Sequence, residues 1–196
     1  MPESVKERIM YSAIKLFAEK GFHETKVDEI AKNSDVSKGT IYLYFASKEE
    51  LLEKSIDFVL TKAIQNYDFE EGKSFEENLR NIIFKNAEFV KKHVDFYKVM
   101  FSSFYRVRKN EEFMKRKCDF ESIHSRISSL LEGGVREGVI RKDISISNLS
   151  LLLTNLIFSS MMSLVIMLVF GETDSDEKVR GFVEDVYKFA VSAVKG

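Results

Sequence analysis

Apolar residues recur along the whole chain at the spacing of three and four positions that places them on one face of an α-helix. The first such stripe consists of Ile9, Ala13, Leu16 and Phe17, and it predicts a helix over residues 5–20. The same period predicts further helices at about residues 26–33, 37–45, 48–67, 75–93, 95–105, 111–137, 146–170 and 175–195. Because no segment keeps the two-residue alternation of a half-buried strand, we expect an all-α fold of about nine helices.

Short polar residues mark the starts of these predicted helices. Ser-x-x-Glu occurs at residues 4–7, 47–50 and 74–77, and close variants begin at Thr25 and Asp174. In this capping box the serine and glutamate side chains each accept a hydrogen bond from a backbone amide of the first turn. Proline occurs only at position 2, so no proline interrupts any of the predicted helices.

Two short helices, predicted at residues 26–33 and 37–45, are separated by a tight turn. Together with the preceding helix they have the arrangement of a helix-turn-helix. Val36, Ile41 and Phe45 are the residues of this region that we expect to be buried. So short an element cannot bury its remaining small, hydroxyl and aromatic side chains, and such an exposed face suits the major groove of DNA.

The sequence from Val36 to Phe45, VSKGTIYLYF, followed by KEELL at residues 48–52, resembles the TetR family of transcriptional regulators. Members of that family typically show a run of the form GVSKGTLYRYFPSKEEL, and the resemblance covers about a quarter of the chain. Further matches are Ala18, Lys20-Gly21-Phe22, Thr25 and Ile30-Ala31. Two departures are visible, because Asp35 replaces a common glycine and Ala46 replaces a common proline. Neither removes a contact group, but Asp35 puts a negative charge near the DNA backbone.

The resemblance implies an N-terminal three-helix helix-turn-helix DNA-binding domain over residues 1–47 and a C-terminal helical ligand-binding and dimerisation domain over residues 48–196. It implies contacts with double-stranded operator DNA for Thr25, Lys26, Ser37, Lys38, Gly39, Thr40, Tyr42, Leu43, Tyr44 and Lys48. Thr25 is expected to cap the second helix and to offer its hydroxyl or the helix N-terminus to a phosphate. Lys48 is expected to hold a phosphate at the rim, and Leu43 to touch a thymine methyl. The alternative is that Tyr42 and Tyr44 are half-buried residues that only support the fold, and that the lysines are merely solvated.

Bulk charge adds nothing to this DNA-binding prediction. The formal net charge of the chain is −1, and residues 1–48 hold 8 Lys and Arg against 7 Asp and Glu. The prediction therefore depends on where particular side chains point.

The single cysteine, Cys118, excludes an intramolecular disulfide, and the N-terminal sequence has no apolar signal-peptide region. We therefore expect a cytoplasmic protein.

Aromatic residues are concentrated in the second part of the chain, where 14 of the 17 phenylalanines follow residue 46. Such residues are usually core, but the resemblance implies an effector cavity in this domain, and an apolar cavity suits a small lipophilic effector. Our candidates for its lining are Phe89, Phe101, Phe104, Phe120, Phe158 and Met162. Gly133 and Gly134 fall inside the helix predicted at 111–137, where we expect them to weaken or kink it.

Residues 149–170 contain no charged side chain, and 22 residues are enough to span a bilayer. Polar residues interrupt the run, and Asn155, Ser159 and Ser163 share one helix face, where small side chains allow another helix to approach. The resemblance implies that the last two helices form a homodimer interface, for which our candidates are Leu152, Leu156, Ser159, Ser163, Val183, Val186, Phe189 and Ala190. A membrane anchor is the alternative interpretation of this run.

The expected function is therefore a DNA-binding transcriptional regulator, a repressor released from a palindromic operator by the effector. The alternative is an enzyme or a lipid carrier that uses the C-terminal apolar cavity. His23, His93 and His124 lack metal-ligand spacing, and the sequence shows no phosphate-binding loop and no nucleophile motif. We accordingly predict no catalytic residue, no metal site and no cofactor.

Overall fold

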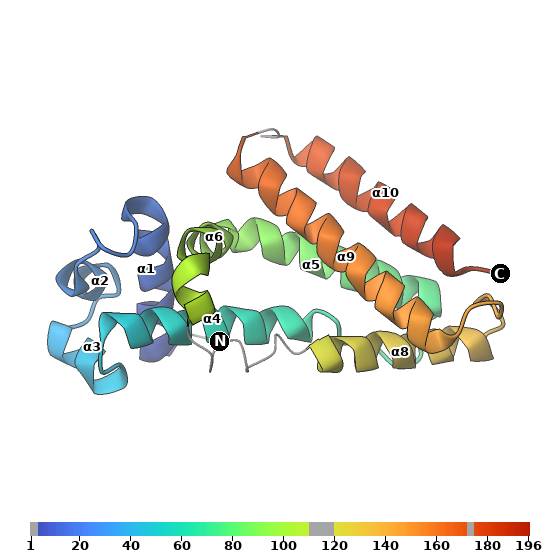
Figure 1. Cartoon of the computed structure of the whole chain (residues 1–196), viewed down its shortest axis with the longest axis horizontal. Helices are drawn as coiled ribbons and strands as arrows, with labels where there is room; N and C mark the ends of the chain where they lie inside the picture. Colours follow the sequence, from blue (N-terminus) through green and yellow to red (C-terminus); the bar gives the residue numbers. More distant parts are fainter. Residues whose placement is uncertain (1–3, 110–119, 172–174) are drawn as a thin grey trace. The chain divides into compact units, whose positions relative to one another are not determined.

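The computed structural model describes residues 4–109, 120–171 and 175–196. Within these ranges the chain forms nine helices and no strand, so the all-α prediction is confirmed (Figure 1). The helices are α1 Val5–Lys20, α2 Val27–Asn33, α3 Lys38–Tyr44, α4 Lys48–Gln65, α5 Phe75–Lys92, α6 Val94–Lys109, α8 Phe120–Arg136, α9 Ile146–Val169 and α10 Asp176–Val194. The predicted helix at 111–137 falls partly on residues outside the described ranges, and its described part is α8.

Serine side chains hold the first turns of most of these helices. Ser4 and Ser74 form complete capping boxes with Glu7 and Glu77, as the sequence predicts. Ser37, Ser145 and Ser175 each accept a hydrogen bond from the amide three residues further on, at the starts of α3, α9 and α10. These bonds satisfy amides that have no partner within the helix.

The prediction that Thr25 caps the second helix is wrong. The residue before α2 is Lys26, and its amide donates a hydrogen bond of 3.0 Å to the Glu29 carboxylate. The Thr25 hydroxyl is instead buried and donates to the carbonyl oxygens of Leu16 at 3.1 Å and Gly21 at 2.8 Å. Thr25 therefore fixes the chain after α1 rather than the first turn of α2.

The described residues form two compact units. The first contains residues up to 61 together with those from 95 to 109, and the second contains residues 62–94, 120–171 and 175–196. The first unit thus includes α1–α3, most of α4 and nearly all of α6. The domain boundary at residue 47 stays a prediction, because the first compact unit extends beyond it. The core of the first unit is apolar and closed to solvent, since Ile9, Phe17, Ile41, Phe45 and Ile56 are each no more than 2% exposed.

The second unit is built from α5, α8, α9 and α10, with α5 packed against each of the other three. The helices α9 and α10 lie side by side (Figure 1). Three ion pairs link α5 to α10 and to Lys195, the residue after α10, and they are spread along the length of the helices. These pairs are Glu76–Lys195 at 2.5 Å, Arg80–Glu184 at 2.8 Å and Lys91–Asp176 at 2.8 Å. Most of these side chains are partly exposed, so each pair adds little stability on its own.

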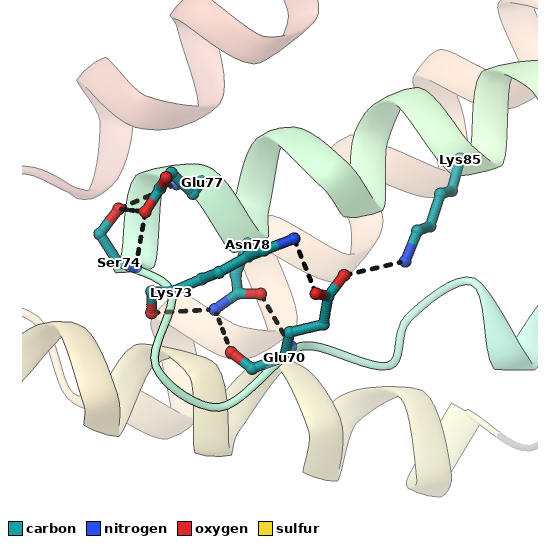
Figure 2. Close-up of polar contacts among 6 residues, drawn as sticks. All are labelled: Glu70, Lys73, Ser74, Glu77, Asn78 and Lys85. Carbon is teal, nitrogen blue, oxygen red and sulfur yellow. Dashed lines mark hydrogen bonds and ion pairs between the residues drawn. The ribbon is translucent and has the colours of Figure 1, made fainter.

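The loop between α4 and α5 is held by one buried side chain, Asn78 (Figure 2). The Asn78 side-chain oxygen accepts a hydrogen bond from the Glu70 amide, and its NH₂ group donates to the carbonyl oxygens of Glu70 at 3.0 Å and Lys73 at 3.2 Å. The Glu70 carboxylate in turn pairs with Lys73 at 2.7 Å and Lys85 at 3.8 Å. The loop therefore has a fixed course and enters α5 at the Ser74 cap.

Gly134 lies where side chains of other segments approach the backbone of α8 closely. A Cβ atom at this position would lie 2.6 Å from Cγ1 of Ile140 and 3.0 Å from the ring of Phe75. The same end of α8 is joined to α5 because the Glu137 carboxylate accepts hydrogen bonds of 3.1 Å from the Phe75 amide. Gly134 does not interrupt α8, which continues to Arg136. Because it has no side chain, Ile140 and Phe75 can lie close to the backbone of α8.

Candidate nucleic-acid interface

The turn between α2 and α3 contains the one non-glycine residue with a positive φ among those described, Asp35 at φ 54°. This left-handed conformation explains why a glycine is common here in the family that the sequence resembles, and aspartate is among the side chains that tolerate it. The amide of Val36 donates to the Ala31 carbonyl at 3.0 Å, and the Ser34 hydroxyl donates to the Ile30 carbonyl at 2.7 Å. These bonds fix the angle between the two helices.

The second helix of the motif, α3, is anchored by two buried residues. Ile41 is 2% exposed, and Phe45, which directly follows the helix, is 1% exposed. Ser37 caps the helix, and its hydroxyl lies 2.8 Å from that of Thr40. Val36 is only half-buried, so the prediction of its burial holds in part.

The opposite face of α3 projects into solvent. Tyr42 is 49% exposed, Leu43 84% and Tyr44 45%. Gly39 has open space around it, because an added Cβ would meet only the Ser37 hydroxyl, at 3.6 Å. The fold therefore does not require a glycine at this position, and a side chain there would thicken the exposed face.

Two lysines of the predicted interface are exposed. Lys38 pairs with Asp28 on α2 at 2.9 Å, and this contact raises the pKa of the Lys38 ammonium above its usual value. Both side chains are at least half exposed, so the pair is solvated and an approaching phosphate can compete for Lys38. Lys26 is exposed at the start of α2.

Two residues with a predicted phosphate contact have side chains bonded inside the fold in this structure. Thr25 is completely buried, with its hydroxyl already bonded inside the fold. Lys48 donates to the carbonyl oxygens of Phe22 at 2.8 Å, His23 at 3.2 Å and Thr25 at 2.9 Å. An ammonium group has three N–H donors, so these carbonyl oxygens would compete with a phosphate for Lys48, and its DNA contact stays a prediction.

Three of the six predicted effector-cavity residues, Phe89, Phe158 and Met162, have described side chains. The ring of Phe89 stacks on His93 with 4.3 Å between centroids, and Met162 is half-buried. Phe158 is 45% exposed and lies on the outer face of α9, so its assignment to an enclosed cavity is wrong for the single chain. The side chains of Phe101, Phe104 and Phe120 lie outside the described part.

Two hollows among the described residues of the second unit are lined by none of the predicted cavity residues. One, of about 660 Å³, lies between the α4–α5 loop and α8 and is lined mostly by polar residues, including Glu70, Lys73 and Asn78. The other, of about 450 Å³, lies between α5 and α10 and includes Arg80 and Lys91. Glu70, Lys73, Asn78, Arg80 and Lys91 make the contacts described above.

The predicted dimer interface is divided between two environments. Val183, Val186 and Ala190 are at most 8% exposed and pack inside the second unit, so they cannot meet another chain, and their assignment is wrong. Leu152, Ser159, Ser163 and Phe189 are exposed, and Leu156 is half-buried.

Exposed apolar side chains extend this surface along both helices. We call it the α9–α10 outer face and define it by Leu151, Leu152, Phe158, Ile166, Phe170 and Phe189, which are between 45% and 72% exposed. Sequence reasoning missed Leu151, Ile166 and Phe170, although they follow the four-residue spacing of Asn155, Ser159 and Ser163 closely enough to have been found.

The helix that carries most of this face is unusually apolar. By length and composition α9 is able to cross a membrane, with 24 residues and a mean hydropathy of 2.1, and a third of its most apolar window is buried. Within the described part of the chain, no group of three or more His, Cys, Asp or Glu side chains has the geometry of a metal site.

Comparisons with known proteins agree with this architecture. Residues 9–54 match the family model of bacterial regulatory proteins, tetR family. The uncharacterised HTH-type transcriptional regulator YhgD of Bacillus subtilis is 32% identical over 138 residues, which are 69% of this chain and 72% of that protein. A transcriptional regulator of Saccharomonospora viridis in complex with choline superposes with a TM-score of 0.74 at 19% identity, over 97% of both chains. The regulator FadR of Bacillus subtilis in complex with stearoyl-CoA gives 0.70 at 22% identity, over 94% of this chain and 97% of that one.

The identity to YhgD over most of both chains reaches well beyond the helix-turn-helix, and the solved structures share the fold over nearly their whole length. These relatives are regulators of transcription and not enzymes. The chain is therefore a member of the TetR family of bacterial transcriptional regulators.

Proposed function

We propose that this regulator is a cytoplasmic homodimeric repressor, which binds a palindromic operator and is released from it by a small lipophilic ligand. The observation that carries the proposal is the solvent-facing side of α3, a helix of only 7 residues. Apolar surface left in water is unfavourable, and Leu43, at 84% exposure, gains a partner where it meets a thymine methyl in the major groove. Lys26 and Lys38 supply charge for backbone phosphates.

The dimer is supported by the α9–α10 outer face. An apolar surface of this extent usually marks an interaction site, and a twofold axis allows one face to serve both partners. Asn155, Ser159 and Ser163 provide short side chains within it, which permits close helix approach. A dimer would present two α3 helices to half-sites about 34–36 Å apart.

The effector is proposed to bind inside the second unit. Thr154 on α9 is 2% exposed, and its hydroxyl has no hydrogen-bond partner in the described structure, so the interior contains an unused polar group. Phe89 and Met162 remain candidates for apolar contacts. The stearoyl-CoA complex of FadR indicates that this fold accommodates a long acyl chain.

Release would follow from a two-state equilibrium. The helix α4 is continuous between residues 48 and 65 and so passes from the first compact unit into the second. A ligand that binds more tightly to a state in which α4 is displaced lowers the affinity for the operator. The size of this effect is limited by the ratio of the ligand's affinities for the displaced and undisplaced states. Repression and release are therefore linked through one helix.

The test is fluorescence anisotropy with DNA from upstream of the gene that encodes the protein, against scrambled DNA, at several salt concentrations. We expect selective binding by two protomers per site, or a multiple of two, with affinity falling as salt rises. Leu43→Ala should change base preference and leave the salt dependence unaltered. If neither a wider DNA selection nor added long-chain acyl compounds reveals sequence preference, the proposed function is wrong.

The oligomeric state is tested separately by light scattering. The wild-type protein should be a dimer, and Leu152→Glu combined with Phe189→Glu should give monomers, because two charges would be buried in each half of the interface. The control Lys142→Glu, at an exposed residue of the loop between α8 and α9, should remain dimeric. Partition of the wild-type protein into detergent would instead favour the membrane interpretation of α9.

A further inference from the structure

The helix-turn-helix carries no excess of positive charge. Residues 26–45 contain three lysines and three acidic residues. A protein that neutralises backbone phosphates usually collects cations on the surface that it presents to DNA. In this motif the acidic residues offset the lysines, so an approaching phosphate meets charges of both signs.

The three acidic residues differ in what surrounds them. Glu29 is tied to the end of α1, because its carboxylate binds the Lys20 ammonium at 2.5 Å. Asp35 is exposed in the turn between α2 and α3. Asp28, on α2, binds the Lys38 ammonium at 2.9 Å. The carboxylate of Asp28 is therefore the one that engages the lysine of α3, the helix with the solvent-facing side chains.

The pair between Asp28 and Lys38 bridges the two helices of the motif from the solvent side. Lys38 is the first residue of α3, and the side chains of Lys38 and Asp28 are 50% and 66% exposed. Water screens such a pair, so it adds little to the stability of the fold. Its effect on DNA binding is larger, because an acceptor on DNA can take Lys38 only if the Asp28 carboxylate is left without its cation beside the phosphates. Like charges placed together at an interface oppose binding.

We propose that Asp28 is a specificity-determining residue, which makes the DNA contact of Lys38 conditional on a close fit of α3 in the major groove. The inference rests on the proposed function, because it requires an operator in which α3 is seated. On arbitrary DNA the fit is poor, and the pair between Asp28 and Lys38 stays intact. At the operator the seated helix brings the ammonium to acceptors that offset the loss of the pair. Asp28 thus weakens binding to arbitrary DNA more than binding to the operator, which is selection by a penalty on the wrong partner.

Asp28→Asn and its matched control Asp35→Asn remove the same charge from the same motif, but only the first releases Lys38. Asparagine tolerates the left-handed conformation of the turn, so the control keeps its backbone. Fluorescence anisotropy on scrambled DNA should show a slope of log affinity against log salt that is steeper by about 0.9 in Asp28→Asn than in Asp35→Asn, which is the contribution of one phosphate contact. The ratio of operator affinity to scrambled-DNA affinity at 50 mM salt should fall about threefold or more in Asp28→Asn and stay near the wild-type value in the control.

Two further variants test whether Asp28 acts through Lys38. In a Lys38→Met background, Asp28→Asn and Asp35→Asn should change scrambled-DNA binding equally, because no ammonium remains to be released. Asp28→Glu keeps a carboxylate within reach of Lys38 and should retain the wild-type ratio of operator to scrambled-DNA affinity. Far-UV circular dichroism on the full-length variants confirms that each is folded.

Equal salt slopes for Asp28→Asn and Asp35→Asn would overturn the inference, and so would an operator-to-scrambled ratio that Asp28→Asn leaves unchanged. A difference between the two variants that persists in the Lys38→Met background would overturn it as well, since Asp28 would then act without Lys38. The slopes on scrambled DNA require no operator. A steeper slope for Asp28→Asn in a protein that selects no DNA sequence would therefore keep the restraint on Lys38 and reject the proposed function instead, so the two failures are distinguishable.

Discussion

Two adjacent glycines of α8 should respond differently to the same substitution. Alanine at Gly134 would place a Cβ 2.6 Å from Cγ1 of Ile140 and 3.0 Å from the Phe75 ring. Ile140 and Phe75 are 3% and 1% exposed, so neither has room to withdraw. Alanine at Gly133 would meet only the end of the Arg136 side chain, at 3.8 Å, and that flexible chain can move.

The two variants share one energetic contribution and differ in the other. Replacing glycine by alanine within a helix stabilises by about 0.5–1 kcal/mol, because the unfolded chain has fewer conformations to lose. Overpacking a closed core destabilises by about 1–3 kcal/mol, and only Gly134→Ala overpacks. The difference between the variants therefore isolates the steric contribution, and for a chain of this length it corresponds to about 2–12 °C in melting temperature.

The assay is thermal unfolding followed by far-UV circular dichroism at one fixed protein concentration, since any dimer makes the melting temperature depend on concentration. Gly133→Ala should melt above the wild type and Gly134→Ala below Gly133→Ala. Ile140→Ala should be less harmful in the Gly134→Ala background than alone, because it removes the clashing atom. A melting temperature for Gly134→Ala equal to or above that of Gly133→Ala would refute the reasoning.

Three further predictions concern the second unit. Thr154→Val should raise the free energy of unfolding in denaturant by about 1 kcal/mol, because it removes a buried hydroxyl that has no partner; a loss of stability would mean that a bound molecule holds the hydroxyl. Arg80 and Glu184, joined by two hydrogen bonds of 2.8 and 2.9 Å, should show a small coupling in a double-mutant cycle that decreases as salt is added, and a coupling insensitive to salt would contradict the solvated character of the pair. Burial lowers the pKa of His93 from 6.5 to about 4, with Lys92 and then Lys62 adding to the effect. As the pH falls, His93 therefore binds a proton in the unfolded chain before it does so in the folded one. The free energy of unfolding should be at its full value above pH 6.5 and decrease as the pH falls toward 4. His93→Gln should flatten this part of the plot of stability against pH.

The sequence predicted the helices well because their ends are encoded locally. A serine and a residue three positions later suffice to define a first turn, and α1 and α5 begin where the capping boxes place them. The outward face of α3 was predictable for a similar reason, since a helix of 7 residues can bury only a few side chains.

Features that depend on distant partners were not predictable in this way. Periodicity shows that Val183, Val186 and Ala190 form a stripe, but it does not say whether α5 of the same chain or a second chain covers it. Likewise, nothing near Lys48 in the sequence indicates that carbonyl groups more than 20 residues earlier occupy its ammonium. The family resemblance favoured a phosphate there, and the packing of the first unit gives another partner.

The serine caps have a consequence for the order of events during folding. Within the described ranges, six helix starts place a serine hydroxyl within reach of an amide three residues later, at Ser4, Ser37, Ser47, Ser74, Ser145 and Ser175. Such contacts close very short loops, so they form without waiting for remote segments to meet. Nucleation is the slow and unfavourable step of helix formation, and these serines fix its position in the chain. A nascent polypeptide can thus set the register of its helices while it is still leaving the ribosome, before the partners that bury them have been synthesised.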